Sequence, residues 1–94
     1  MSGPGDALSY EEAKKLARHG NAEARAALAA RKDIEPEILV FLAGDSAPEV
    51  RRTIAANLTT PRQADLVLAK DADEDVRTGL AEKIAKVAPD LSAS

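Results

Sequence analysis

The stretch DSAPEVRRTIA, residues 45–55, returns in altered form as DADEDVRTGLA, residues 71–81. Each copy begins with aspartate, carries a Val-Arg pair near its middle and ends with an aliphatic residue followed by alanine. The second copy starts twenty-six positions after the first, at Asp71 and Asp45 respectively. A fixed period of this length is the signature of a repeat architecture, so this pair of stretches decides the fold.

The same period extends toward the N-terminus and gives a third, weaker copy. Several columns of equivalent residues recur three times when the chain is shifted by that period. The clearest columns are Leu16, Leu42 and Leu68, then Arg25, Arg51 and Arg77, then Leu28, Ile54 and Leu80, each leucine or isoleucine being followed by alanine. We therefore predict three repeats, each twenty-six positions long.

Helix start signals divide each repeat into two short helices. Pro36 and Pro48 stand where a first helical turn tolerates proline. Side chains that cap a helix N-terminus precede other segments: Ser9 with Glu12, Asn21, Thr60 with Gln63, and Asp73. The sequence thus predicts six helices, over residues 9–19, 22–31, 36–43, 48–57, 61–70 and 74–86.

Helices this short are marginal alone, so each must bury its apolar stripe on a neighbour. A stack of helix pairs provides those neighbours. The predicted fold is all-α, a short right-handed α-solenoid of three helical-hairpin repeats. We expect one repeat domain over residues 8–89, a disordered N-terminus (1–7) and a frayed C-terminus (90–94).

Composition excludes several classes of function. The 94 residues carry a formal net charge of −3 and no cysteine, which argues against broad nucleic-acid binding, disulfides and thiolate chemistry. The only histidine, His19, has no cluster of ligands beside it in the sequence. No catalytic constellation, phosphate loop, membrane span or secretory signal is evident. We expect a cytoplasmic protein that is not an enzyme and holds neither a metal nor a cofactor.

The repeated arginines, with two aspartates in the preceding turns, have two interpretations. They could form an anion-binding ladder, since a guanidinium group grips carboxylates and phosphates. The favoured interpretation is structural: a contact between aspartate and arginine would tie each inter-helix turn to its second helix. The residues concerned are Arg25, Asp45, Arg51, Asp71 and Arg77, with His19 in the aspartate column of the first repeat.

The segment from Val50 to Arg77 resembles the leucine-rich repeat variant pattern, and more generally HEAT-like repeats. It is also similar to an uncharacterised bacterial family, a domain of unknown function, with such repeats. The resemblance covers about residues 9–89. It implies an α-solenoid that acts as a protein-binding scaffold. The iron–sulfur motif that accompanies the original variant repeat cannot apply, because this chain has no cysteine.

The leading functional hypothesis is a non-enzymatic protein–protein interaction scaffold or regulatory adaptor. Successive second helices would form its binding face. One polar and mostly basic column is predicted to face outward and to favour an acidic protein segment. The candidate partner-binding residues are Arg31, Asn57 and Lys83 of that column, with Arg52 and Thr78 beside the fixed arginines.

The unbroken apolar run from Ile38 to Ala43 supports a second hypothesis. Part of this helix, above all Val40 and Phe41, must face outward or meet another element, and Val67 occupies the column of Phe41. These side chains either contact neighbouring repeats or form an exposed patch. In the second case the helix could pair with its own copy in a homodimer. Nucleic-acid binding, as in some HEAT-like proteins, is the weakest alternative.

Overall fold

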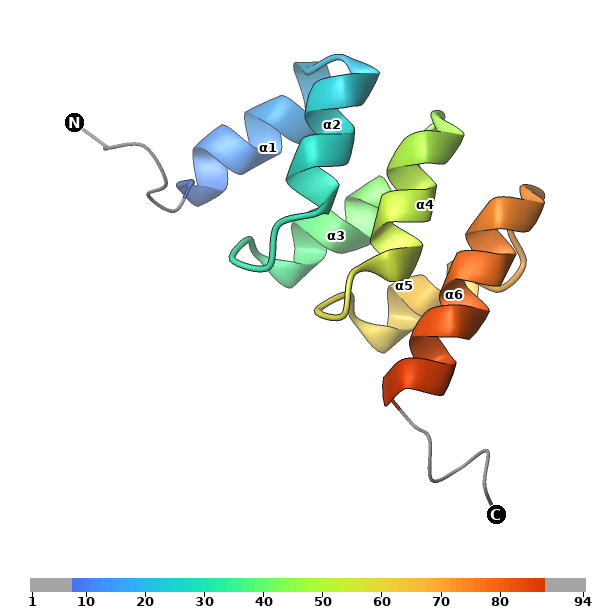
Figure 1. The fold of residues 1–94 in the computed structure, drawn as a ribbon. Coiled ribbons are helices and arrows are strands. Elements are labelled where there is room, and N and C mark those ends of the chain that lie inside the picture. The colour runs from blue at the N-terminus through green and yellow to red at the C-terminus, as the bar shows by residue number, and fades with distance from the viewer. Residues whose placement is uncertain (1–7, 88–94) are drawn as a thin grey trace.

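The computed structural model describes residues 8–87 and contains six helices there, with no strand among these residues (Figure 1). They are α1 (Tyr10–His19), α2 (Ala22–Ala29), α3 (Pro36–Leu42), α4 (Pro48–Ala56), α5 (Arg62–Leu68) and α6 (Glu74–Val87). The predicted all-α class and all six helices are confirmed, with every boundary within two residues. The expectations for residues 1–7 and 90–94 fall outside the described residues.

The helices form three successive pairs, α1–α2, α3–α4 and α5–α6. First helices begin at residues 10, 36 and 62, and second helices begin at residues 22, 48 and 74. Both series therefore advance by a constant step, which equals the period of the sequence columns. Equivalent columns consequently occupy equivalent places in successive pairs.

The three pairs lie side by side, so the molecule has two rows of helices (Figure 1). One row contains the first helices, α1, α3 and α5, and the other contains the second helices, α2, α4 and α6. Each helix packs against its pair partner and against the next helix of its own row. The result is an elongated body with principal extents of 50, 26 and 19 Å.

Local chemistry explains where most helices begin. Ser9 and Glu12 form the reciprocal capping box at α1, and Asn21 accepts a hydrogen bond from the Ala24 N–H at α2. The Asp73 carboxylate does the same for the Val76 N–H at α6. Helices α3 and α4 have no side-chain cap and start with proline at their first position.

The predicted cap of α5 is wrong. Pro61 is the capping residue of that helix, and no side chain bonds the free N–H groups there. The Thr60 hydroxyl instead donates to the Ile54 carbonyl at 2.9 Å, and its side chain is buried. Thr60 therefore closes the end of α4 rather than opening α5.

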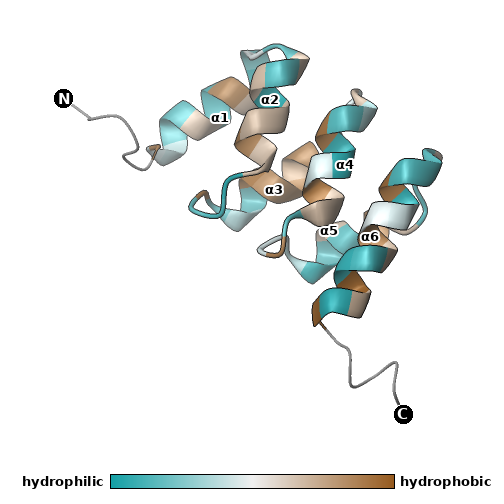
Figure 2. Ribbon diagram, in the orientation of Figure 1, coloured by the Kyte–Doolittle hydropathy of each residue, from teal (hydrophilic) through white to brown (hydrophobic). Residues whose placement is uncertain are grey.

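The core lies between the two rows and is made mainly of aliphatic side chains from the repeating columns. Helix α3 contributes most for its length and is coloured as hydrophobic beyond its first turn in Figure 2. Each fully buried aliphatic side chain contributes about 1.5–3 kcal/mol relative to exposure. The largest fully buried side chains are Leu28, Leu39, Leu42, Val50, Ile54, Leu68 and Val76.

Candidate interaction surfaces

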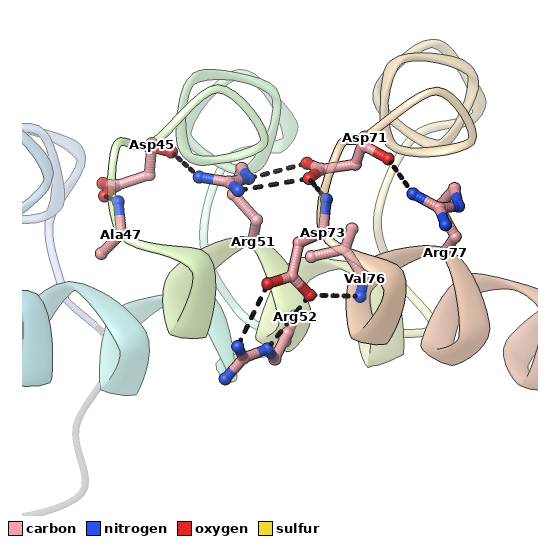
Figure 3. A network of polar contacts seen from close by, with 8 residues as sticks. All are labelled: Asp45, Ala47, Arg51, Arg52, Asp71, Asp73, Val76 and Arg77. Atoms are coloured by element: carbon pink, nitrogen blue, oxygen red, sulfur yellow. Dashed lines mark hydrogen bonds and ion pairs between the residues drawn. The ribbon is translucent and has the colours of Figure 1, made fainter.

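The repeated arginines and aspartates form a ladder that joins one helical pair to the next (Figure 3). The Arg51 guanidinium donates from Nε and Nη2 to the two carboxylate oxygens of Asp71, at 2.7 and 3.2 Å. Arg25 donates in the same way to Asp45, at 2.7 and 3.0 Å. These bidentate pairs are largely buried, and each connects a second helix with the following turn.

This geometry corrects the predicted aspartate–arginine contact. Arg51 does bond Asp45, six residues earlier, but its Nη1 donates to the backbone carbonyl at 2.7 Å and not to the carboxylate. Arg77 bonds the Asp71 carbonyl in the same way at 2.6 Å. Each turn is thus held to its own second helix through the backbone, while its carboxylate binds the arginine of the preceding pair.

Both ladder carboxylates have a lowered pKa. For Asp45 and Asp71 burial alone raises the pKa, because it disfavours the charged form. Hydrogen bonds from the paired arginine and from a backbone N–H two residues on, together with the nearby positive charges, outweigh that effect. The carboxylates are therefore ionised and fully engaged inside the fold, which supports the structural interpretation of these residues.

A second set of bonds joins the C-terminal ends of the second helices, and it overturns the predicted outward column. The Asn57 amide donates to the carbonyls of Ala29 and Arg31, both at 2.8 Å. The Lys83 ammonium donates to the Asn57 carbonyl at 3.0 Å and to Asp65 at 2.7 Å. Asn57 and Lys83 are each only 6% exposed, so neither can contact a partner.

The other predicted partner-binding residues lie on the surface, but two of them are already paired. Arg31 binds both carboxylate oxygens of Asp33, at 2.9 and 2.7 Å. Arg52 reaches Asp73, its closest contact being 3.2 Å. Thr78 is exposed on α6. The second helices therefore do not present the continuous basic column that the sequence suggested.

The apolar run on α3 is mostly core. Ile38, Leu39, Leu42 and Ala43 are at most 4% exposed, so these four side chains do not lie on the surface. Val40 is partly buried against the core.

The exposed apolar side chains come instead from two helices of the first row. Phe41 is 55% exposed and Val67 is 59% exposed, which favours the exposed-patch alternative over contact with neighbouring repeats. Leu66, in the column of Val40, is 60% exposed.

Grooves separate the first helices on the side where these apolar residues lie. The groove between α1 and α3 measures about 530 Å³, and Phe41, Lys14 and Arg18 contribute to its lining. The second groove lies between the turn that follows α3 and the end of α5 and measures about 670 Å³. It is lined by Leu66, Val67 and Lys70 together with the ladder residues Asp45, Arg51 and Asp71. We call this surface the first-helix face. It comprises Lys14, Arg18, Phe41, Leu66, Val67 and Lys70.

Basic residues of the first-helix face carry charge that the described part of the chain does not neutralise. No carboxylate of residues 8–87 lies within 4 Å of the charged groups of Lys14, Arg18 or Lys70. Glu37, which also lines the first of these grooves, accepts a hydrogen bond of 2.6 Å from the Tyr10 hydroxyl. That bond, to a carboxylate, is the main reason for the raised pKa of Tyr10. Sequence reasoning missed these basic residues, although Lys14 and Arg18 share columns with Leu66 and Lys70.

Other kinds of site are not found in residues 8–87. No three histidine or carboxylate side chains there come together as a metal site would require. Across the same range, every helix is too short or too polar to cross a bilayer. Comparisons with protein-family models, with curated proteins and with solved structures found no match to this chain.

Proposed function

We propose that the chain is a short right-handed α-solenoid of three helical repeats that acts as a protein-interaction module without catalysis of its own. Its partner is an acidic amphipathic segment of another protein, which binds the first-helix face. The observation that carries the proposal is the presence, on one face, of uncovered apolar side chains beside basic side chains.

The solenoid part of the proposal is supported by the constant step that both helix series share. It is also supported by the two sets of bonds that join consecutive pairs at equivalent columns, the arginine–aspartate pairs and the bonds from Asn57 and Lys83. An architecture in which each unit contacts only its neighbours is what repeat proteins use to build extended binding surfaces. This agrees with the resemblance to HEAT-like and leucine-rich variant repeats.

The apolar part of the partner would occupy the two grooves of the first row. Phe41 lies at the groove between α1 and α3. Val67 and Leu66 lie at the second groove, between the turn that follows α3 and the end of α5. All three side chains are more than half exposed, and covering them removes apolar surface from water. An aromatic anchor beside a groove is the kind of residue that dominates binding energy in protein interfaces.

The charge of the partner follows from the basic rim. The whole chain is acidic, with a net charge of −3, yet the first-helix face carries Lys14, Arg18 and Lys70 without carboxylate partners among the described residues. An acidic segment would neutralise these groups and would be steered toward this face and not toward the rest of the surface. The proposal therefore keeps the acidic partner predicted from the sequence and moves it to the other row of helices.

Affinity capture from lysate of the source cells, with two double variants, tests this proposal. Phe41→Ser with Val67→Ser removes the apolar anchors from the first-helix face. Arg52→Ser with Thr78→Ala alters the exposed face of α4 and α6 and serves as the matched control. Circular dichroism should show the same helix content for both variants, because all four side chains are exposed.

The expected result is that the first variant loses a partner that the wild type and the control both retain. Backbone amide resonances of residues in α1, α3 and α5 should then shift when the captured partner is added to labelled protein. Retention of the partner by the Phe41/Val67 variant, with loss in the Arg52/Thr78 control, would assign binding to the second helices and defeat the proposal.

A further inference from the structure

The third helical pair leaves exposed, among residues 8–87, the positions that the first two pairs bury. Ala29 and Ala55 are fully buried, whereas Ala81, at the same column of α6, is exposed. In the first row Ala43 is 3% exposed, whereas Ala69, at the same column of α5, is exposed. The outer side of α5 and α6 therefore keeps the shape of a pair-to-pair interface.

Arg77 gives this side a specific chemical requirement. Arg25 and Arg51 each make two kinds of bond, one to the backbone of their own turn and one to the aspartate carboxylate of the next pair. Arg77 makes the backbone bond, but the other N–H groups of its guanidinium bind no carboxylate of residues 8–87. Figure 3 shows it at the end of the ladder, joined only to Asp71 among the residues drawn.

The surface beside Arg77 carries small side chains. We call Ala69, Arg77 and Ala81 together the end face. Ile84 does not belong to it, because Leu58, at the same column of α4, is 51% exposed even though the third pair follows it. Between the first two pairs, and between the second and third, the equivalent surfaces are closed by a following pair whose turn supplies aspartate. The end face thus repeats an interface that the molecule already forms twice.

A second copy of this chain does not meet the requirement. Stacked head to tail, a copy would bring its first pair against the end face. Its aspartate column is occupied by His19, which has no carboxylate. In addition, Glu12 occupies the column in which Ile38 and Ala64 are buried, so the first pair has a charge at that position.

We infer that the end face is a second docking site whose occupant is a helical pair of another protein. That pair carries an aspartate in the turn between its helices, and the carboxylate binds the Arg77 guanidinium as Asp71 binds Arg51. The surface is separate from the first-helix face, so loss of one interaction leaves the other intact.

A variant of the chain itself provides the probe. Glu12→Gln removes the charge from the edge of the first pair and keeps the capping box with Ser9. His19→Asp supplies the missing carboxylate. Arg77→Gln in the same molecule prevents the probe from stacking on itself. The matched control has Glu12→Gln and Arg77→Gln but keeps His19. Each is mixed with wild-type protein, and the mass of the species is measured by light scattering after gel filtration and by sedimentation.

The expected result is a one-to-one complex with the probe and an affinity roughly 10- to 100-fold weaker with the control, because one charge-assisted pair is missing. Equal binding of probe and control would overturn the role of the carboxylate. Absence of a complex with either would overturn docking of a separate polypeptide.

A single longer chain with a fourth helical pair tests the surface itself. In this chain residues 1–82 are followed by a second copy of residues 57–87, which places the copied Asp71 beside Arg77. The extended chain should melt in one transition at a higher temperature than the wild type, and Asp71→Asn within the copy should reverse part of that gain. If the added pair melts separately, or if Asp71→Asn in the copy leaves the melting temperature unchanged, the end face does not bind an aspartate as Arg51 does.

Discussion

Replacing Lys83 with methionine separates the buried role of this residue from the exposed role that its sequence position suggests. Methionine keeps an unbranched apolar stem but removes the ammonium group. The bonds lost are those to Asp65 at 2.7 Å and to the Asn57 carbonyl at 3.0 Å, with a longer one to the Ile54 carbonyl at 3.4 Å. Together these bonds fasten α6 to the end of α4 and to α5.

The expected cost follows from how buried each group is. Hydrogen bonds that involve a charged group each contribute about 1.5–3 kcal/mol, and the 3.4 Å contact adds little. Two effects reduce the loss: Asp65 is 21% exposed and can be hydrated, and methionine avoids burying a charge. A net loss of about 2–3 kcal/mol results, which in a domain of this size lowers the melting temperature by about 10–20 °C.

Thermal and urea unfolding, followed by circular dichroism at neutral pH, measure this loss. Lys86→Met is the matched control, since Lys86 lies on the same helix and is exposed; its effect should stay within about 0.5 kcal/mol. A double-mutant cycle with Asp65→Asn should give a favourable coupling between the two residues. Equal stability of the two methionine variants would refute the burial of Lys83.

Two further predictions concern the ladder and the glycines. Asp71→Asn should lower stability at pH 7 by about 1–3 kcal/mol. Because the folded-state pKa of Asp71 is lowered, its contribution to the free energy of unfolding is present above about pH 4 and is lost as the pH falls through the folded-state pKa. In urea titrations below about pH 4, the free energy of unfolding should therefore decrease less steeply with falling pH for the variant than for the wild type. Gly79→Ala should stabilise α6 by about 0.5–1 kcal/mol, since the added Cβ would lie 3.8 Å from that of Ala55. Gly20→Ala should destabilise, since its Cβ would lie 2.7 Å from a backbone oxygen of α1; melting temperatures that moved in the same direction for both alanine variants would contradict this pair of predictions.

Local signals were enough to predict the helices. Pro36 and Pro48 mark helix starts because their ring fixes a helical φ and the missing N–H is not needed there. Ser9 and Asn21 act through bonds that span three residues, so their sequence neighbours suffice to identify them. The repeat period then indicated the pairing of helices, because equivalent columns must meet equivalent surroundings.

The error about the outward column concerns bonds between distant parts of the chain. Lys83 reaches the Ile54 carbonyl across 29 residues and Asn57 reaches that of Ala29 across 28. Polar residues near the end of a helix were interpreted as exposed, since the acceptors are backbone groups that carry no sequence signature. One signal was available: Arg31, Asn57 and Lys83 are polar in every repeat, and a constant polar column suggests a constant acceptor. The basic rim beside Phe41 was missed because those columns differ between repeats.

Because contacts are restricted to neighbouring pairs, they also determine how the molecule folds and where it unfolds locally. Among residues 8–87 no helix of the first pair touches one of the third, and the side-chain bonds between pairs span at most 29 residues. Low sequence separation favours fast folding, because little loop entropy is lost before contacts form. Of the three pairs that the structure describes, only α3–α4 has a neighbour on each side, so its amide protons should exchange most slowly, with protection falling toward both ends. A partner that covers the end face would raise the protection of α6 most, so the rate of amide exchange there becomes a direct measure of occupancy.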